Sequence, residues 1–421
     1  MDRCKEYMGG LEKTVLQFNN IVIFGCGRKG LYLFNILKNN NKNILAFTDN
    51  NKKIWNKKVR GKTVLSPKDV VNKYPDAYYC IAITIQANEI KQQLEGMGVK
   101  SEKIIMDSNI FTNDNIMNMS YPIISLCIPT NGVSEWVFPV LDKIYAQGVD
   151  KRLFEVVVTD NGDDEVFQSK MEEYVKEHDN MIYKKTDAYM FDNQIEALKI
   201  ANGEYLKFIN HRSVLVHGAL QYFINYIRIN MDDKPVIYFS NGSLNIANEI
   251  EEYDSFDAFV GGLKHIASWT TGVGIWRQDF ERIPTDYHYD KISPHSGVLF
   301  AEKGKNKYII NDVHWMNEIE TSHAKKGTYD LYKAFAVEEL DITLGLYKNG
   351  DISISTFKKV REAYKNIIIK FYYQFNIKKE PCSYDLNGFD NNVGIFFNKY
   401  EIVFASYLYA LNKIIKNICR R

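Results

Sequence analysis

The sequence lacks the features that mark several large classes of protein. Its 53 Lys and Arg are matched by 52 Asp and Glu, so the net charge is +1 and the basic excess typical of duplex nucleic-acid binders is missing. No apolar run approaches the ~18 residues that a membrane-spanning helix needs. The first residues, Met1 to Glu6, are not followed by an apolar core, so no secretory signal is evident. We expect a globular protein of the cytoplasm.

Cysteine is scarce, and its spacing excludes two kinds of site. No two cysteines form a C-x-x-C pair, and several lie inside apolar runs. This pattern favours buried free thiols in a reducing compartment over a disulfide framework or a zinc site. The six residues are Cys4, Cys26, Cys80, Cys127, Cys382 and Cys419.

The length of 421 residues exceeds the size at which one hydrophobic core stops growing, so two or three domains are expected. A polar, Met-rich segment at 113–120 is typical of a linker. We predict an α/β protein with an N-terminal Rossmann-like domain over 1–117, a central domain over 118–329 and a helical region over 330–421.

The first domain shows short apolar runs at 21–24, 44–47, 78–83 and 104–106, with a helix expected after Ser66-Pro67. Strands that alternate with helices predict a parallel sheet joined by right-handed crossovers.

A glycine loop follows the first of these strands. Gly25, Gly27 and Gly30 form G-x-G-x-x-G between a strand and a helix, where backbone amides can approach a pyrophosphate. Asp49, after the second strand, lies where an acid would bind ribose hydroxyls. The loop therefore favours nucleotide or nucleotide-sugar binding; the alternative is that the glycines serve only the turn and helix packing. Residues 18–110 resemble the small Rossmann-like domains fused to bacterial sugar-modifying enzymes.

The central domain repeats the alternation. Strands are predicted at 123–128, 154–159 and 205–209, separated by helices at 134–147, 166–177 and 190–201. The strands end in polar residues, and open α/β sheets bind ligands at that edge.

Residues 121–300 resemble glycosyltransferases of family 2, with the GT-A fold. Four segments match in order. Ser125 to Thr130 resembles the first strand of the family, and Phe154 to Gly162 resembles the second strand, whose terminal Asp contacts the nucleotide base. Asn193 to Tyr205 resembles the helix and turn before the metal-binding motif, and Ser268 to Phe280 resembles the segment that shapes the acceptor pocket.

The resemblance implies a nucleotide-sugar donor held by Pro129, Thr130, Asn131, Asp160 and Asn193. Asp160 would accept an N–H of a pyrimidine ring, although Asp-Asn-Gly is also strong turn chemistry. After Thr130 the sequence departs from the family's Tyr-Asn-Arg, which leaves the identity of the nucleotide open.

A second departure concerns the metal. Where the family carries Asp-x-Asp, this chain has Asn210-His211-Arg212, which lacks the carboxylates that a hard cation prefers. We predict that Arg212, with Asn210 and His211, faces the diphosphate, because a guanidinium fork binds two phosphate oxygens at any working pH. No cofactor is then required and no metal ligands are assigned; a metal held elsewhere and a decayed, inactive site are the alternatives.

For the general base, the family's position falls at His295, after Pro294 at a predicted helix start. The positive helix end would keep His295 neutral and ready to accept a proton. Asp290 is the second candidate, either as base or as the residue that orients His295. Trp269 and Trp276 flank the acceptor segment and suit either a sugar face or a protein core.

The C-terminal segment 358–421 is basic, with twelve Lys or Arg against five Asp or Glu, a net charge of +7. Its last part carries apolar residues at helical spacing. This pattern fits a helix on the anionic inner face of a membrane, where lipid-linked saccharides would be the acceptors. An ordinary core helix with solvated lysines is the interpretation that we favour over the membrane helix, because Phe404, Leu408 and Leu411 would serve either role.

Together these features predict an inverting glycosyltransferase of surface polysaccharide synthesis, acting on a saccharide or lipid-linked saccharide and not on nucleic acid. The alternatives are an NAD-dependent nucleotide-sugar oxidoreductase or epimerase centred on the glycine loop, and a non-catalytic nucleotide-sugar-binding scaffold. The sequence leaves open the donor sugar, the acceptor, the linkage and the oligomeric state.

Overall fold

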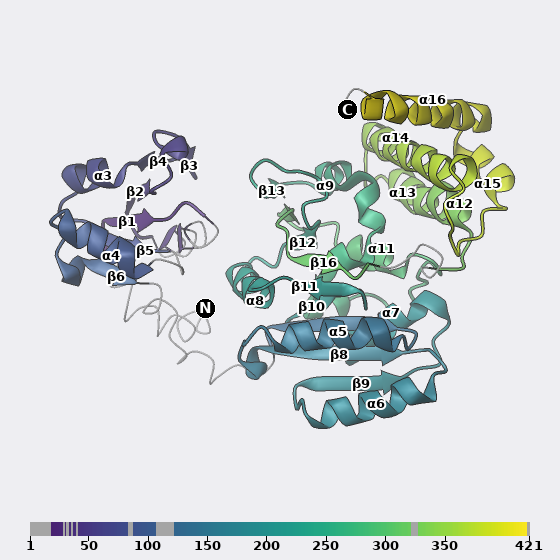
Figure 1. Cartoon of the computed structure of the whole chain (residues 1–421), viewed down its shortest axis with the longest axis horizontal. Coiled ribbons are helices and arrows are strands. Elements are labelled where there is room, and N and C mark those ends of the chain that lie inside the picture. Colours follow the sequence, from purple (N-terminus) through teal and green to yellow (C-terminus); the bar gives the residue numbers. More distant parts are fainter. Residues whose placement is uncertain are drawn as a thin grey trace. The chain divides into compact units, whose positions relative to one another are not determined.

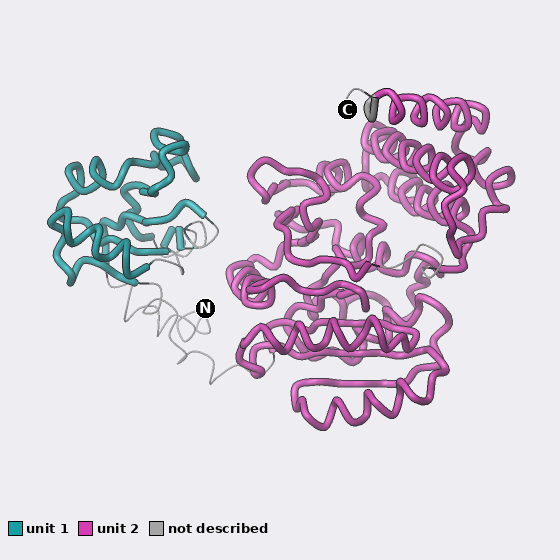
Figure 2. Tube along the Cα trace, viewed as in Figure 1, with its two compact units in different colours: residues 1–120 teal, residues 121–421 magenta. Residues whose placement is uncertain are grey.

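The chain folds into two compact units, residues 1–120 and 121–421 (Figures 1 and 2). The computed structural model describes residues 18–27, 30, 33–34, 37–38, 41–82, 87–106, 122–320 and 327–418. Both units contain parallel strands covered by helices, which confirms the predicted α/β class. The predicted linker, 113–120, lies outside the described residues.

The first unit contains a six-stranded sheet in the order β3-β4-β2-β1-β5-β6. The four predicted strands are present and run parallel: β1 (Ile21–Phe24), β2 (Ile44–Thr48), β5 (Tyr78–Ile81) and β6 (Ile104–Met106). Helices α3 (Pro67–Lys73) and α4 (Ala87–Gly96) connect them. Ser66 begins α3 by accepting the N–H of Asp69 at 3.1 Å.

A hairpin at the edge of this sheet was not predicted. β3 (Lys58–Val59) and β4 (Lys62–Leu65) pair antiparallel, and β4 also pairs parallel with β2. The turn places Arg60 at φ 48° and Gly61 at φ 77°. Two consecutive positive φ values are typical of a tight hairpin turn. The hairpin was not predicted because its many lysines obscure the alternation of apolar and polar residues that marks a strand.

The glycine loop has two residues with different constraints. A Cβ on Gly30 would lie 1.8 Å from the carbonyl oxygen of Gly25, so helix and strand approach too closely for any side chain. A Cβ on Gly27 would meet nothing within 4 Å. Packing therefore explains Gly30 and leaves the space above Gly27 open.

We predict that Gly30→Ala disrupts the first unit, whereas Gly27→Ala does not. The added methyl group at position 30 overpacks backbone against backbone, which typically costs ~1–3 kcal/mol. Hydrogen–deuterium exchange of the full chain should show faster exchange in peptides of 18–106 for Gly30→Ala, with peptides of 122–320 unchanged. Equal protection in the two variants would contradict the close packing at Gly30.

The second unit is built on a five-stranded sheet in the order β14-β10-β7-β8-β9. Four strands are parallel and β14 is antiparallel. Helices on both faces bury β7 and β8 almost completely, so these strands read as near-continuous apolar runs. The strands are β7 (Ile124–Thr130), β8 (Phe154–Asp160), β9 (Met181–Lys185), β10 (Tyr205–Phe208) and β14 (Gly274–Trp276), joined by helices α5 (Ser134–Tyr145), α6 (Glu165–Lys176) and α7 (Asn193–Ile200).

Two smaller sheets extend the unit beyond β10. One has the order β12-β15-β13 and the other pairs β11 with β16. Their strands are β11 (Ser213–Leu215), β12 (Val236–Phe239), β13 (Ile250–Tyr253), β15 (Tyr308–Asn311) and β16 (Met316–Glu318), and helices α8 (Ala219–Ile229), α9 (Phe256–Leu263), α10 (Arg277–Phe280) and α11 (Pro294–Leu299) pack among them.

The helical region expected from residue 330 is present, and it shares a hydrophobic core with the sheets. Val360, Tyr364 and Ile368 belong to the same buried cluster as Leu206 and Tyr238. Two stretches, Ala334–Glu338 and Tyr372–Ile377, are π-helical. The helices are α12 (Leu331–Lys333), α13 (Glu339–Lys348), α14 (Ile354–Phe371), α15 (Phe389–Phe396) and α16 (Lys399–Ile418).

The last helix, α16, lies at the periphery of the second unit (Figure 1). Phe404, Leu408 and Leu411 are 65%, 45% and 53% exposed, so the interpretation that they fill an ordinary core is wrong. In the described part of the chain, no helix has the length and apolar character to cross a membrane. Among the described residues, Cys80 and Cys127 are buried free thiols, as predicted, whereas Cys26 and Cys382 are free but only half-buried.

Candidate functional site

The carboxyl ends of three parallel strands meet in the second unit. β7 lies between β10 and β8, and Thr130 at the end of β7 is in register with Asp160 at the end of β8. Nδ1 of His211, just beyond β10, lies 2.9 Å from Oγ1 of Thr130. The structure thus brings the predicted residues Thr130, Asp160 and His211 to one edge of the sheet.

Asn193 locks two of these strand ends together. Its Nδ2 donates to the carbonyl oxygens of Thr130 at 3.0 Å and Thr159 at 2.8 Å, and its Oδ1 accepts from Thr186 at 2.8 Å. The side chain is buried, so it acts as a brace that fixes the edge. Of the other predicted donor residues, Pro129 is half-buried and Asn131 is exposed.

Asp160 is fully buried at the end of β8. Its Oδ1 accepts the N–H of Gly162 at 2.8 Å and its Oδ2 accepts the hydroxyl of Tyr183 at 3.1 Å. Burial raises the pKa of this carboxyl above its usual value, while these two hydrogen bonds lower it. The turn role considered for Asp160 is therefore real, because the Gly162 bond closes the Asp-Asn-Gly turn.

His211 is neutral in this setting. Burial lowers its pKa to about 3, and the neighbouring positive charge of Arg212 acts in the same direction. The ring lies with its centroid 5.0 Å from that of Trp136 on α5. His211 therefore contributes a polar, uncharged wall to the site.

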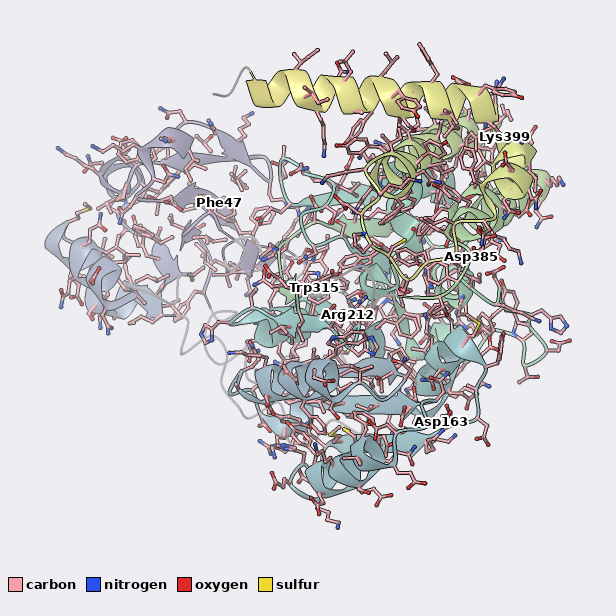
Figure 3. The ribbon with its side chains drawn as sticks, turned by 45° about the vertical axis from the view of Figure 1, so that its right-hand side comes forward. Phe47, Asp163, Arg212, Trp315, Asp385 and Lys399 are labelled. Carbon is pink, nitrogen blue, oxygen red and sulfur yellow. The ribbon has the colours of Figure 1, made fainter. Side chains whose placement is uncertain are left out.

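Arg212 has an unusual environment for a charged side chain. Its guanidinium carbon lies 5.1 Å from the centroid of the Trp136 ring, an arrangement that favours a cation. Its charge also acts on the phenols of Tyr329 and Tyr384, whose pKa values are raised by burial and lowered by this neighbour. Arg212 is half-buried in the second unit, and Figure 3 labels its position.

The hydrogen-bond donors of Arg212 are unmatched. Nε and Nη1 are buried and have no hydrogen-bond partner among the residues that the structure describes. Buried donors are nearly always satisfied, and leaving one unmet costs ~1–3 kcal/mol, more for a charged group. A guanidinium held in this way is suited to a ligand that is an anion with several oxygen atoms.

The residues at 210–212 do not suit a divalent cation. Oδ1 of Asn210 accepts the backbone N–H of Arg212 at 3.0 Å, His211 hydrogen-bonds to Thr130, and Arg212 is positive. In the described ranges, no group of three His, Cys, Asp or Glu side chains has the geometry to hold a metal ion. A hard cation prefers several free oxygen ligands, and this triplet does not offer them.

The predicted base His295 lies on α11 and is buried. Its Nε2 lies 2.9 Å from the carbonyl oxygen of Ser268, and its Nδ1 lies 3.2 Å from the hydroxyl of Thr270. Burial lowers its pKa to about 4. His295 is neutral, as expected, but both ring nitrogens are occupied within the protein.

Asp290 lies four residues before the start of α11 and is half-buried. Its Oδ1 accepts the N–H groups of Ile292 at 2.9 Å and Ser293 at 2.8 Å. These bonds hold the carboxylate in place through one oxygen.

Two acids of the helical region, which sequence reasoning missed, adjoin Asp290. Glu339 is buried, accepts hydrogen bonds from Ser293 and from Tyr364, and has its pKa raised to about 7 by burial. Glu338 ends a π-helical turn; burial and then the charge of Asp290 raise its pKa, and its Oε2 is buried without a partner. The charges of Arg212 and Glu339 both act on Tyr329, so the cationic and acidic groups border one region.

Lys207 is a second buried cation that the sequence did not reveal. Its Nζ donates to the carbonyl oxygens of Phe208 at 3.0 Å and of Thr271, and it lies 4.9 Å from the centroid of the Trp315 ring. Burial holds its pKa well below the usual value for lysine. These bonds tie the end of β10 to the segment that contains Trp269, and they leave Lys207 without access to a ligand.

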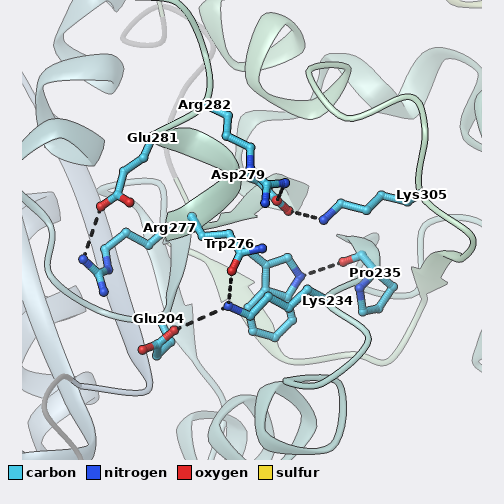
Figure 4. A network of polar contacts seen from close by, with 10 residues as sticks. Glu204, Lys234, Pro235, Trp276, Arg277, Asp279, Glu281, Arg282 and Lys305 are labelled. Carbon is cyan, nitrogen blue, oxygen red and sulfur yellow. Dashed lines mark hydrogen bonds and ion pairs between the residues drawn. The ribbon is translucent and has the colours of Figure 1, made fainter. Parts of the chain in front are cut away.

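The two predicted acceptor tryptophans differ in position. Trp276 is 1% exposed, and its Nε1 donates to the carbonyl oxygen of Pro235 at 2.8 Å, inside the polar network of Figure 4. Trp269 is half-buried, with its ring centroid 6.3 Å from that of Trp315. We therefore include Trp269 in the candidate site and treat Trp276 as a core side chain.

In the first unit, the carboxylate of Asp49 holds the glycine loop. Its Oδ2 accepts the N–H of Cys26 at 2.9 Å, and its Oδ1 accepts the N–H of Asn51 at 2.8 Å. Asp49 thus braces the loop that carries Gly25 and Gly27, and a ribose would meet a carboxylate already engaged on both oxygens.

Comparisons with known proteins match different parts of the chain. Residues 17–105 match the family described as C2185-like, N-terminal. A search of the curated proteins gave no match. Among solved structures, the chain is similar to residues 1–349 of S. aureus TarS in complex with UDP-GlcNAc (TM-score 0.44, 16% identity, 61% of this chain and 75% of that chain).

A second similar structure is the mannosyltransferase PcManGT from Pyrobaculum calidifontis in complex with GDP-Man and Mn2+, with a TM-score of 0.39, 16% identity, and coverage of 63% of this chain and 76% of that chain. Likenesses this distant carry no argument about chemistry. The assignment of the site depends on the residues of this chain alone.

The buried state of His295 predicts how stability depends on pH. With a pKa of about 4 when folded and ~6.5 when unfolded, only the unfolded chain takes up this proton between those values. The histidine therefore costs stability as the pH falls from ~6.5 to ~4, on the order of 3 kcal/mol in full.

His295→Gln should lower the melting temperature near neutral pH, and the deficit should shrink as the pH falls. The exposed His288→Gln serves as the matched control and should follow the wild type. A deficit that is constant over this range in a scanning fluorimetry series would show that His295 is not buried as a neutral ring.

Proposed function

We propose that the second unit is an inverting glycosyltransferase that moves a sugar from a nucleotide-sugar donor to a hydroxyl group of a saccharide. The observation that supports this most directly is that Arg212, a half-buried residue, has its Nε and Nη1 buried without a hydrogen-bond partner. It lies where three parallel strands end, which is the position at which open α/β sheets bind ligands. A diphosphate offers the oxygen atoms that would satisfy these donors.

The donor's base is proposed to lie against Thr130 and Asp160. Asp160 has both oxygens engaged, but each carboxylate oxygen has a second lone pair that can accept from a ring N–H. The raised pKa of Asp160 reflects burial, and a further donor would favour its charged form. Asn193 keeps the two strand ends in register and so positions both residues.

In the proposed reaction, the acceptor oxygen forms a bond to the anomeric carbon while the bond from that carbon to the diphosphate oxygen breaks. The acceptor's proton passes to a carboxylate, and the electron pair of the broken bond leaves with the diphosphate. Arg212 stabilises the charge that develops on this leaving group, in the role that a bound cation usually has. One displacement inverts the anomeric configuration.

We assign the base to Asp290 in preference to His295. Oδ1 of Asp290 is fixed by two backbone N–H groups. Oδ2 remains for the acceptor hydroxyl, whereas both ring nitrogens of His295 have partners inside the protein. Glu338 and Glu339 lie close enough for the charge of Asp290 to act on both, so this side of the proposed site is acidic.

The remaining parts of the function are proposed by family resemblance. They are a role in surface polysaccharide synthesis, a lipid-linked acceptor at the inner face of the membrane, and nucleotide binding at the glycine loop of the first unit. A thermal-shift panel of nucleoside diphosphates and their sugars, with and without divalent ions, identifies the donor, because a ligand that binds the native state raises its melting temperature.

We predict that Arg212→Met lowers kcat/KM by ~10²–10³ with the donor so identified, since removal of a donor to developing charge has costs of this size. Arg212→Lys should have a kcat/KM between those of the wild type and Arg212→Met, because lysine keeps the positive charge but cannot donate two parallel hydrogen bonds as a guanidinium does. Initial rates of nucleotide release, measured in excess chelator, provide the test.

The matched control for this series is Arg282→Met, which removes an exposed arginine outside the site and should leave the rate unchanged. Wild-type activity should survive chelation. If chelation abolishes it and Mn2+ restores it, a cation and not Arg212 acts on the diphosphate.

A second kinetic prediction separates the two candidate bases. Asp290→Asn should lower kcat by ~10²–10⁴ with little change in donor affinity, since a general base contributes a factor of this size. His295→Gln should retain most of kcat at a temperature where both variants are folded. The reverse ranking would return the role to His295.

A further inference from the structure

Helix α16 has apolar side chains on two opposite faces. The inner face packs on the helical region: Ile402 and Ser406 are fully buried, and Oγ of Ser406 donates to the carbonyl oxygen of Ile369 at 3.1 Å. The outer face has seven large apolar side chains that are 45–84% exposed: Tyr400, Phe404, Tyr407, Leu408, Leu411, Ile414 and Ile415. A surface helix normally has a single apolar stripe, and this outer face has no partner among the described residues of the second unit.

The spacing of the outer face is that of a helix that packs on another helix. Tyr400, Phe404, Tyr407, Leu411 and Ile414 follow one another in steps of four, three, four and three residues. This alternation is the heptad pattern of a packed helical seam. Leu408 and Ile415, each one residue beyond a member of the seam, widen it on one side.

Over residues 399–415, whose side chains are described, the charged side chains of α16 turn away from this seam. Lys399 pairs with Asp390 at 3.0 Å, and Glu401 pairs with Lys365. Lys413 lies on the inner side, 5.5 Å from the ring centroid of Tyr373. A helix that binds an anionic lipid surface presents Lys or Arg beside its apolar stripe. Here those cations serve contacts within the protein, so the outer face suits an uncharged protein surface.

We propose that the outer face of α16 binds the same face of a second copy of this chain. Such an isologous contact joins two identical uncharged seams about a two-fold axis. The seam from Tyr400 to Ile414 is ~21 Å long. If each of the seven side chains buries roughly half of its ~150–200 Å², the contact covers on the order of 1,200 Å² in total, which reaches the size of specific interfaces.

The test is the mass of the full chain in solution, measured by sedimentation velocity at micromolar concentration. The wild type should sediment as a dimer, and the double variant Phe404→Lys, Leu411→Lys should sediment as a monomer, because two buried charges would face their own copies. Asn412→Lys is the matched control: it adds a charge at an exposed position of α16 outside the seam and should remain dimeric.

Co-sedimentation with vesicles of phosphatidylserine and phosphatidylcholine provides the second arm. A monomeric wild type that binds these vesicles, with binding lost in the double variant and kept in Asn412→Lys, would overturn the proposal in favour of a membrane surface. A dimer that the double variant does not dissociate, or a monomer that ignores the vesicles, would also overturn it. Unchanged far-UV circular dichroism of both variants shows that the chain remains folded.

Discussion

The structure depends on how a single charged side chain, Arg212, is held. The chain places its guanidinium against the ring of Trp136, near the phenols of the half-buried Tyr329 and Tyr384, and gives its Nε and Nη1 no acceptor among the described residues. Buried hydrogen-bond donors without an acceptor are costly, and a ligand that accepts from them would remove this cost. His211 is neutral, so the positive charge of the 210–212 triplet comes from Arg212.

The second unit brings a cationic and an acidic region together from distant parts of the chain. Arg212 follows a strand of the central sheet, whereas Glu338 and Glu339 belong to the C-terminal helices, which share a hydrophobic core with that sheet. The charge of Arg212 lowers the pKa of Tyr329 and the charge of Glu339 raises it, so both groups lie near this phenol. A departing diphosphate and an acceptor hydroxyl require these opposite environments side by side, because one group gains negative charge while the other loses a proton. The helical region is therefore part of the proposed site and not an appendage.

The sequence was sufficient for the elements whose signal is local. The buried strands ending at Thr130 and Asp160 are continuous apolar runs, and their polar ends had to meet because the strands are parallel. Long-range partners were not predictable: nothing near His295 shows that Ser268 and Thr270 occupy its ring, and nothing near Lys207 shows that it is buried. In the sequence, Glu338 and Glu339 look like ordinary surface residues of a helix. Their position near Asp290 follows only from the packing of the helices on the sheets. The β3–β4 hairpin was hidden by its lysines.

The most direct test of the account is a crystal structure of the full chain with a nucleoside diphosphate, grown in the presence of Mn2+. The account predicts the diphosphate oxygens within hydrogen-bond distance of Nε or Nη1 of Arg212, with no cation between Asn210 and the phosphates. A diphosphate bridged by Mn2+ at this edge, with the guanidinium turned away from it, would contradict the central claim.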